Sequence, residues 1–227
     1  MSLYAWLDLM SIAIPFLAGF HPRLVFYRYW GRLFPALLLT MIPFILWDVV
    51  FTAKGYWGFN AQYLGGSFLF GLPAEEWLFF ICIPYACVFT HHAIVRLGGE
   101  VLWNRKIFVL ITGTLAAACI LILILFHDKA YTVTNTAFVL ITLGIALRYA
   151  PGLLKTYYVT FLVMLIPFFI VNGILTGTGI EDQVVWYNDA ENSGFRLFTI
   201  PVEDLGYAFS LILLNLVLFE KLPGSKP

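Results

Sequence analysis

Seven apolar stretches of about 20 residues constrain this chain more than any other feature of its sequence. A stretch of that length crosses a bilayer as an α-helix, because a helix satisfies its own backbone hydrogen bonds without water. The composition agrees, since 61% of the residues are hydrophobic and only 11% are charged. We therefore predict an all-α integral membrane protein with seven transmembrane helices. The predicted spans are Leu3–Phe20, Leu33–Ala53, Trp77–Val95, Ile107–Phe126, Val133–Ala150, Tyr157–Leu175 and Leu205–Phe219.

The first span is expected to remain in the mature protein. No basic region precedes it, Asp8 interrupts it, and no small-residue cleavage site follows it. The formal net charge is zero and the basic residues are scattered, so we expect no nucleic-acid partner. Cys82, Cys87 and Cys119 lie in apolar stretches without ligand-type spacing, which favours small core residues over a disulfide framework or a metal site.

The distribution of Lys and Arg predicts the orientation in a cell membrane. The connections after spans one, three, five and seven hold ten basic residues, and the opposite side holds three. Because basic residues accumulate on the cytoplasmic side, we expect the N-terminus outside and the C-terminus in the cytoplasm. The ten residues are Arg23, Arg28, Arg32, Arg96, Arg105, Lys106, Arg148, Lys155, Lys221 and Lys226.

The sequence contains an internal repeat. Ile42-Pro43-Phe44 with Asp48 recurs in the second half as Ile166-Pro167-Phe168 with Asn172, and Pro73-Ala74-Glu75-Glu76 recurs as Pro201-Val202-Glu203-Asp204. The order is the same in both copies, and a single span separates them, so the copies are expected to be parallel. We predict a three-helix repeat over residues 1–106, a linker helix over 107–126 and a second three-helix repeat over 127–227.

Parallel repeats bring the two acidic pairs to the same end of the bundle. We expect Glu75, Glu76, Glu203 and Asp204 to converge on one site, in the first turns of their helices, where a preceding proline is well tolerated. Plain capping of the helix N-termini is the alternative interpretation. Because the motif occurs twice, we favour the interpretation as a shared functional site over plain helix capping.

A layer of further polar residues is expected at a similar depth. Asp8, Asp48, Asn135 and Asn172 all fall within about 10 Å of the acidic pairs at 1.5 Å per helical residue. Ionisable side chains at that depth are costly unless they face one another or a cavity. Asp48 and Asn172 are therefore candidates to support the site or bind substrate, although they could instead satisfy carbonyl groups freed by the neighbouring prolines.

Aromatic residues close to the acids form a second group of candidates for the site or for substrate binding. Taken singly they are ordinary membrane-interface or core residues, but beside buried acids they could line a cavity that tolerates positive charge, because ring faces attract cations. The selected residues are Trp47, Trp77, Phe80 and Tyr207.

Other polar features have simpler interpretations. His91 and His92 are expected at the membrane interface, and the segment Asn188–Asn192 is expected to be a solvated turn and not a metal site. Nucleotide-binding, metalloprotease and nucleophile-elbow motifs are absent. We therefore expect no cofactor and no metal, and acid–base chemistry on an apolar substrate dissolved in the lipid bilayer.

The two Pro-x-acid-acid motifs, each opening the third span of a three-span unit, resemble the membrane-integral, flavin-independent lycopene cyclase family. In that family the two units occur as separate subunits in some bacteria and as one fused chain in others, and this sequence is similar to the fused form over essentially its whole length. The resemblance implies that Glu75, Glu76, Glu203 and Asp204 are the catalytic acids. The second copy has Asp204 where the first has Glu76, so equal roles for the two halves are not implied.

The resemblance also implies the reaction. A carboxylic acid protonates the terminal double bond of lycopene or a related carotenoid, the next double bond attacks the cation, and a base removes a proton to leave a β-ionone ring. Burial and neighbouring like charges favour keeping at least one carboxyl protonated at neutral pH. This is a cofactor-independent isomerisation.

Three other classes compete with this interpretation. A small-solute transporter shares the 3+1+3 parallel architecture, but its Pro-Gln signature is absent. A retinal protein needs a lysine within the last span, and Leu205–Phe219 contains none. A prenyltransferase needs two Asp-rich metal motifs, for which only Asn188–Asn192 qualifies weakly.

Overall fold

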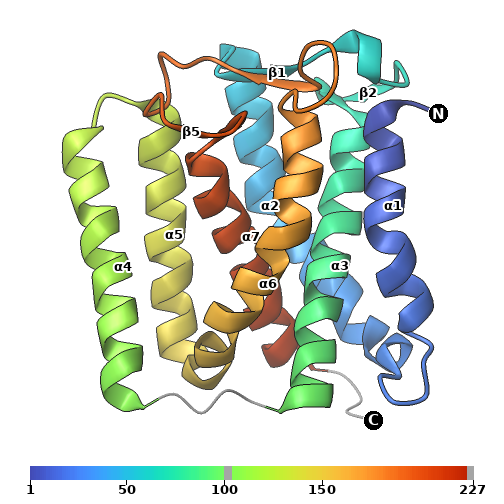
Figure 1. The fold of residues 1–227 in the computed structure, drawn as a ribbon, viewed down its shortest axis with the longest axis vertical. Helices are drawn as coiled ribbons and strands as arrows, with labels where there is room; N and C mark the ends of the chain where they lie inside the picture. The colour runs from blue at the N-terminus through green and yellow to red at the C-terminus, as the bar shows by residue number, and fades with distance from the viewer. Residues whose placement is uncertain (100–103, 224–227) are drawn as a thin grey trace.

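The computed structural model describes residues 1–99 and 104–223, and these form a bundle of seven α-helices with short strands at one end (Figure 1). Each predicted apolar segment corresponds to one helix. The helices are α1 (Leu3–Ala18), α2 (Trp30–Lys54), α3 (Ala74–Gly98), α4 (Arg105–Leu125), α5 (Ala130–Tyr149), α6 (Pro151–Leu175) and α7 (Glu203–Lys221). Lys226, one of the basic residues counted for orientation, lies outside the described residues.

Five helices, α2 to α6, are long and apolar enough to cross a membrane. Helix α1 is apolar but has 16 residues, which is about 24 Å at the helical rise. Helix α7 is not among the five because ionisable residues occupy both its ends, namely Glu203, Asp204, Glu220 and Lys221. The structure therefore confirms a mostly helical protein in which five of the seven helices are suited to crossing a membrane.

Local sequence explains where the helices begin and end. The Ser2 hydroxyl caps α1 by accepting a hydrogen bond from the Ala5 N–H, and Asn104 caps α4 in the same way through Lys106. Gly55, with φ of 69°, ends α2 in the left-handed conformation that glycine adopts without a steric penalty. Pro151 opens α6 at a position where its missing N–H is not needed, which starts that helix before the predicted span.

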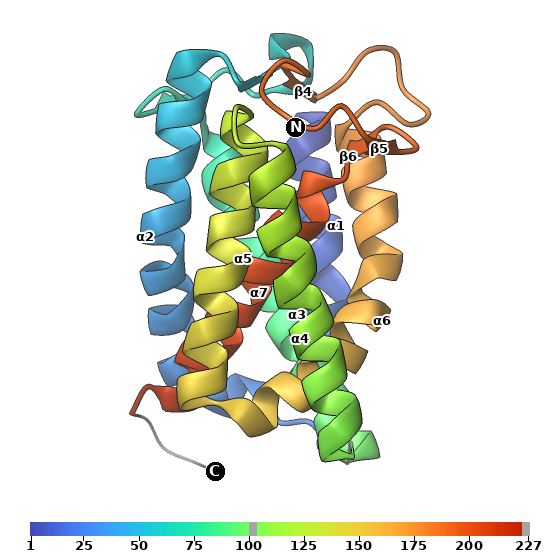
Figure 2. The ribbon, with the colours of Figure 1, turned by 90° about the vertical axis from the view of Figure 1, so that its left-hand side faces the viewer.

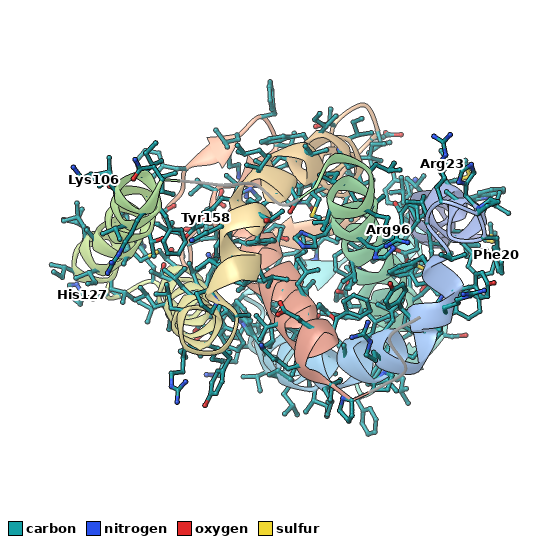
Figure 3. All side chains as sticks on the ribbon, turned by 90° about the horizontal axis from the view of Figure 1, so that it is seen from below. Phe20, Arg23, Arg96, Lys106, His127 and Tyr158 are labelled. Atoms are coloured by element: carbon teal, nitrogen blue, oxygen red, sulfur yellow. The ribbon has the colours of Figure 1, made fainter. Side chains whose placement is uncertain are left out.

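The helices pack in pairs. Helix α1 packs mainly on α3, and α5 packs mainly on α7, while α7 also crosses α2 and α3 contacts α6. Figure 2 shows α7 running obliquely through the middle of the bundle. Helix α4 lies at the edge beside α5, and Figure 3 shows it from below, with Lys106 at one edge and Arg23 at the opposite edge. The side chains of α4 are mostly exposed, as expected for a helix with lipid on most of its surface.

The two long connections form short antiparallel strands over one end of the bundle (Figure 1), where the sequence alone predicted only loops in an all-α fold. Pairing satisfies backbone groups that the apolar surroundings would otherwise leave without partners. The remaining elements are β1 (Trp57–Phe59), β2 (Phe68–Leu69), β3 (Leu72–Pro73), β4 (Val185–Tyr187), β5 (Arg196–Leu197) and β6 (Ile200–Pro201), with 3-10 turns at Phe26–Tyr29 and Ala61–Tyr63.

The pairing of β1 with β4 joins the two long connections to each other. In the β1–β4 ladder Gly58 pairs with Trp186. These two residues are as far apart in the sequence as Glu75 and Glu203 are. The flanking hydrogen bonds run from Asn60 N–H to the Val184 carbonyl and from Asn188 N–H to the Tyr56 carbonyl, both at 2.9 Å. The hairpins β2–β3 and β5–β6 are related by the same offset. Each hairpin ends two positions before the first acid of a pair, next to the start of α3 or α7.

Candidate functional site

An elongated cavity of about 510 Å³ lies inside the bundle at the end covered by the strands and extends away from it. Its walls come mainly from α1, α3, α6 and α7, with single residues from α2 and α5 and four from β1 and β4. Most lining side chains are apolar. All the carboxyl groups and most of the other polar groups lie at the strand-covered end, in a cluster made of Tyr4, Asp48, Trp57, Glu76, Tyr131, Asn172, Tyr187, Asp204 and Tyr207.

Glu76 and Asp48 form one acidic group in the cavity wall. The Tyr4 hydroxyl donates a hydrogen bond of 2.6 Å to Glu76 Oε2, and the carboxyl groups of Glu76 and Asp48 are hydrogen-bonded to each other. The Trp57 side chain is a further hydrogen-bond partner of Asp48. A hydrogen bond between two carboxyl groups requires one of them to carry a proton, because ionised carboxylates only accept. This pair can therefore share one proton inside a predominantly apolar cavity.

Asp204 has a different environment on the other side of the cavity. It accepts hydrogen bonds from the hydroxyl groups of Tyr131 at 2.6 Å and Tyr187 at 3.1 Å, and from the Asn172 amide at 2.8 Å. Tyr187 lies in β4, and its burial raises its pKa well above the ordinary value, with the nearby Asp204 as the next cause. Tyr187 is therefore a neutral hydroxyl donor. Three donors around one carboxyl group are the surroundings that an ionised carboxylate needs.

Glu75 and Glu203 do not line the cavity. Glu75 Oε1 accepts hydrogen bonds from the Ser2 hydroxyl and the Gly65 N–H, both at 2.6 Å. Glu203 Oε1 accepts the corresponding bonds from the Thr132 hydroxyl at 2.6 Å and the Ser193 N–H at 2.8 Å. Glu75 thus ties the start of α3 to the preceding loop and to the start of α1, and Glu203 ties the start of α7 to the preceding loop and to α5.

The other predicted residues divide in the same way. Asp48, Asn172 and Tyr207 line the cavity, but Trp47, Trp77 and Phe80 do not. Trp47 stacks on Phe138 with 4.7 Å between ring centroids, and the Trp77 indole donates to the Leu69 carbonyl in the loop. Phe80 is buried in the aromatic core, 6.4 Å from Phe44.

Three hydroxyl donors at the site, Tyr4, Tyr131 and Tyr187, were not among the candidates chosen from the sequence. Tyr4 and Tyr131 lie in the first turns of α1 and α5, and they donate to Glu76 and Asp204, the second acid of each pair. Aligning the two copies over these helices would have paired the two tyrosines. The same offset pairs Asp8 with Asn135, and both of these side chains are buried. The Asp8 carboxyl oxygens have no hydrogen-bond partner among the described residues.

The histidines and the acidic loop segment lie outside the cavity lining. His91 is hydrogen-bonded to the Thr160 hydroxyl, and His92 to the Leu24 carbonyl. In the loop, Asp189 pairs with Arg196 at 2.6 Å. Partial burial acts to raise the pKa of Asp189, but the hydrogen bonds from Asn192 and Arg196 outweigh it and hold that pKa below its ordinary value. No group of three or more metal-binding side chains is clustered in the part of the chain that the structure describes.

The arrangement suits proton transfer to and from an apolar molecule. A carboxyl pair that can share a proton and a carboxyl group with three hydrogen-bond donors face the same predominantly apolar cavity. In such surroundings an acid and a base can act on one substrate without competing solvent. Phosphate or nucleotide recognition would need cationic groups, and no Lys or Arg lines the cavity among the described residues.

Comparison with known proteins gives one match. The family model described as lycopene cyclase matches residues 1–94 and 128–222. The two matched segments contain α1 to α3 up to Ile94 and α5 to α7, and α4 lies between them. No curated protein and no solved structure is matched by the chain.

Proposed function

Because the chain belongs to the lycopene cyclase family, we propose that it is a membrane carotenoid cyclase that closes β-ionone rings on a linear carotenoid without a cofactor. The family match over most of the chain makes a small-solute transporter the weaker interpretation. The single observation that carries the chemical proposal is the cavity, because three carboxyl groups from different helices, Asp48, Glu76 and Asp204, face one apolar space.

In the proposed first step the Asp48–Glu76 pair is the acid. Its shared proton adds to the terminal double bond of the substrate, and the new C–H bond leaves a carbocation on the adjacent carbon. The next double bond attacks this cation and closes a six-membered ring. The pair suits this role because two interacting carboxyl groups do not both ionise readily in an apolar site.

In the proposed second step Asp204 is the base. It removes a proton from the ring carbon beside the new cation, and the electrons of that C–H bond form the ring double bond. One proton enters and one leaves, so the product is an isomer of the substrate and nothing is oxidised or reduced. Return of the proton from Asp204 to the Asp48–Glu76 pair restores the resting enzyme.

Aromatic rings stabilise the cation between these steps. Tyr207 and Trp57 line the cavity beside the acids, and ring faces attract positive charge, by about 2 kcal/mol or more where water is excluded. Water exclusion also prevents capture of the cation as an alcohol. Glu75 and Glu203 act as positioning residues in this proposal, because their hydrogen bonds hold α3 and α7 against the loops and the first helix of each half.

The same proposal includes the architecture and orientation expected from the sequence: seven spans, as two parallel three-helix repeats joined by α4. The matched packing of α1 on α3 and of α5 on α7 supports two repeats, and so do the ladder and the two hairpins, which share one sequence offset. The connections rich in Lys and Arg lie at the end opposite the strands, which supports a cytoplasmic C-terminus and an outward-facing site.

Expression in cells that accumulate lycopene tests the function, with chromatography of the pigments as the readout. The wild type should convert lycopene to one-ringed and two-ringed products in washed membranes without added cofactor. Glu76→Gln and Asp204→Asn keep the shape of each side chain but remove the acid or base, and should lower the rate by about 10² to 10⁴.

Glu75→Gln and Glu203→Gln are the matched controls, since each makes the same change to the other acid of the same helical turn, which lies outside the cavity lining. They should lower protein stability more than the rate per folded molecule. Equal rates for the wild type and all four variants would show that the carboxyl groups are helix caps. Unchanged lycopene together with uptake of a small polar solute into vesicles would favour the transporter.

A further inference from the structure

We propose that the polyene chain of the substrate enters from the lipid through one lateral opening between α1 and α6, and then lies lengthwise in the cavity with one end at the acids. The proposal rests on the proposed cyclase function for the identity of the substrate. Three observations support it: the shape of the cavity, the place at which the cavity lining reaches the lipid-facing surface, and a difference in side-chain size between the two halves of the bundle.

The cavity has the form of a channel parallel to the helices. Its lining residues on α3 run from Glu76 to Thr90, which is about 21 Å at the helical rise, and those on α6 run from Phe161 to Leu175 over the same length. The acids occupy one end, and the rest of the wall is predominantly apolar. A long, thin, apolar molecule with one reacting end fits this distribution, whereas a compact polar solute would leave most of the channel without polar contacts.

The channel reaches the lipid-facing surface between α1 and α6. Met10 and Ile14 on α1 and Ile170 on α6 line the cavity and are also 63%, 76% and 62% exposed. The two helices contact each other only weakly and lie on the same side of the bundle (Figure 2). A substrate dissolved in the bilayer can therefore reach the acids without crossing the aqueous interface.

The region between α2 and α5, which corresponds to the opening in the other half of the bundle, is filled by packed aromatic side chains. There Trp47 stacks on Phe138 with 4.7 Å between centroids, and Phe44 lies 5.1 Å from the same Phe138 ring. The sequence offset that pairs Tyr4 with Tyr131 also pairs Ser11 of α1 with Phe138 of α5. The offset that pairs Asp48 with Asn172 also pairs Val171 of α6 with Trp47 of α2.

The open side, between α1 and α6, thus has two small side chains at the positions where the closed side, between α2 and α5, has two large aromatic rings. Ser11 and Val171 both line the cavity, whereas Trp47 and Phe138 do not. We infer that Ser11 and Val171 keep the opening wide enough for a polyene. With one opening, the two ends of a symmetric substrate react in separate visits, and the one-ringed product is released between them.

The double variant Ser11→Phe/Val171→Trp tests the opening, because it places on the open side the same two aromatic side chains that Phe138 and Trp47 provide on the closed side. The control is Leu46→Trp/Ile141→Phe, which adds the same kinds of ring to the lipid-exposed faces of α2 and α5 away from the cavity. Two readouts are measured on purified protein in lipid nanodiscs: the initial rate of lycopene cyclisation, and lycopene binding by quenching of tryptophan fluorescence.

The Ser11→Phe/Val171→Trp variant should lose both rate and affinity by about tenfold to a hundredfold, the scale of the penalty for forcing extra atoms into an occupied apolar space. The control should match the wild type in both, and wild-type time courses should show one-ringed product before two-ringed product. Equal rate and affinity in the two double variants would overturn the opening.

The two proposals fail separately. If the wild type binds lycopene but does not cyclise it, the proposed function is wrong, and the opening still stands or falls by the binding of the two variants. If the wild type cyclises lycopene and the Ser11→Phe/Val171→Trp protein does so equally fast, the function stands and the opening is refuted. If the wild type neither binds nor cyclises lycopene, both are refuted. The single variant Val171→Trp, measured in the same way, guards against misfolding of the double variant.

Discussion

Replacing Tyr131 with Phe tests the assignment of Asp204 as the base most directly. The change deletes one oxygen, which donates a hydrogen bond of 2.6 Å to Asp204 Oδ1, and leaves the donors Asn172 and Tyr187 in place. The ring of residue 131 should keep its position, because it packs 5.1 Å from Trp57 and 5.8 Å from Tyr187. The fold should therefore survive while the carboxylate loses one of three donors.

The expected loss follows from the strength of that hydrogen bond. A hydrogen bond to a charged group contributes about 1.5 to 3 kcal/mol, which corresponds to about 10- to 150-fold in rate if the reaction needs ionised Asp204. The initial rate of lycopene cyclisation in membranes, divided by the amount of folded protein, measures it. The unfolding temperature in detergent should fall as well, because the carboxylate is left partly unpaired.

Tyr157→Phe is the matched control. Tyr157 is as fully buried as Tyr131, and its hydroxyl donates at 2.8 Å to the Phe209 carbonyl outside the cavity lining. This variant should lose stability, by about 0.5 to 1.5 kcal/mol or somewhat more if the carbonyl stays unsatisfied, and keep its rate. Equal loss of rate in the two variants, or none in Tyr131→Phe, would refute the role given to the Tyr131–Asp204 hydrogen bond.

Three further predictions concern packing, pH and orientation. Gly206→Ala should destabilise the α5–α7 contact by about 1 to 3 kcal/mol, seen as a lower unfolding temperature, because a Cβ there would lie 2.5 Å from the Asn135 amide nitrogen; an unchanged temperature would contradict this packing. The pKa of Asp189 is lowered in the folded protein, so its contribution to loop stability is present at neutral pH and is lost as the pH falls below about 4; hydrogen exchange of residues 188–196 should accelerate there in the wild type but not in Asp189→Asn. A C-terminal fusion of an enzyme that is active only in the cytoplasm should be active, and an inactive, correctly expressed fusion would reverse the orientation.

Local sequence is enough to predict the helices and the positions of the acids along them. Apolar runs of this length have few alternatives to helix in a bilayer, so each predicted span has its helix, with ends displaced by a few residues where Trp30, Pro151 or Glu203 extends the helix beyond the apolar run. The Pro-x-acid-acid motifs also placed both acidic pairs in first helical turns. These are local properties that composition and spacing carry directly.

Which acid of each pair faces the cavity depends on how the helices pack against one another. Successive residues on an α-helix point about 100° apart, so Glu75 and Glu76 are neighbours in sequence but face different surroundings. Spacing alone cannot tell which of the two faces inward, because the orientation of α3 depends on its packing against α1 and α6. The tyrosine donors and the closed side at Trp47 and Phe138 depend on the same packing, since their partners lie on other helices, far away along the chain.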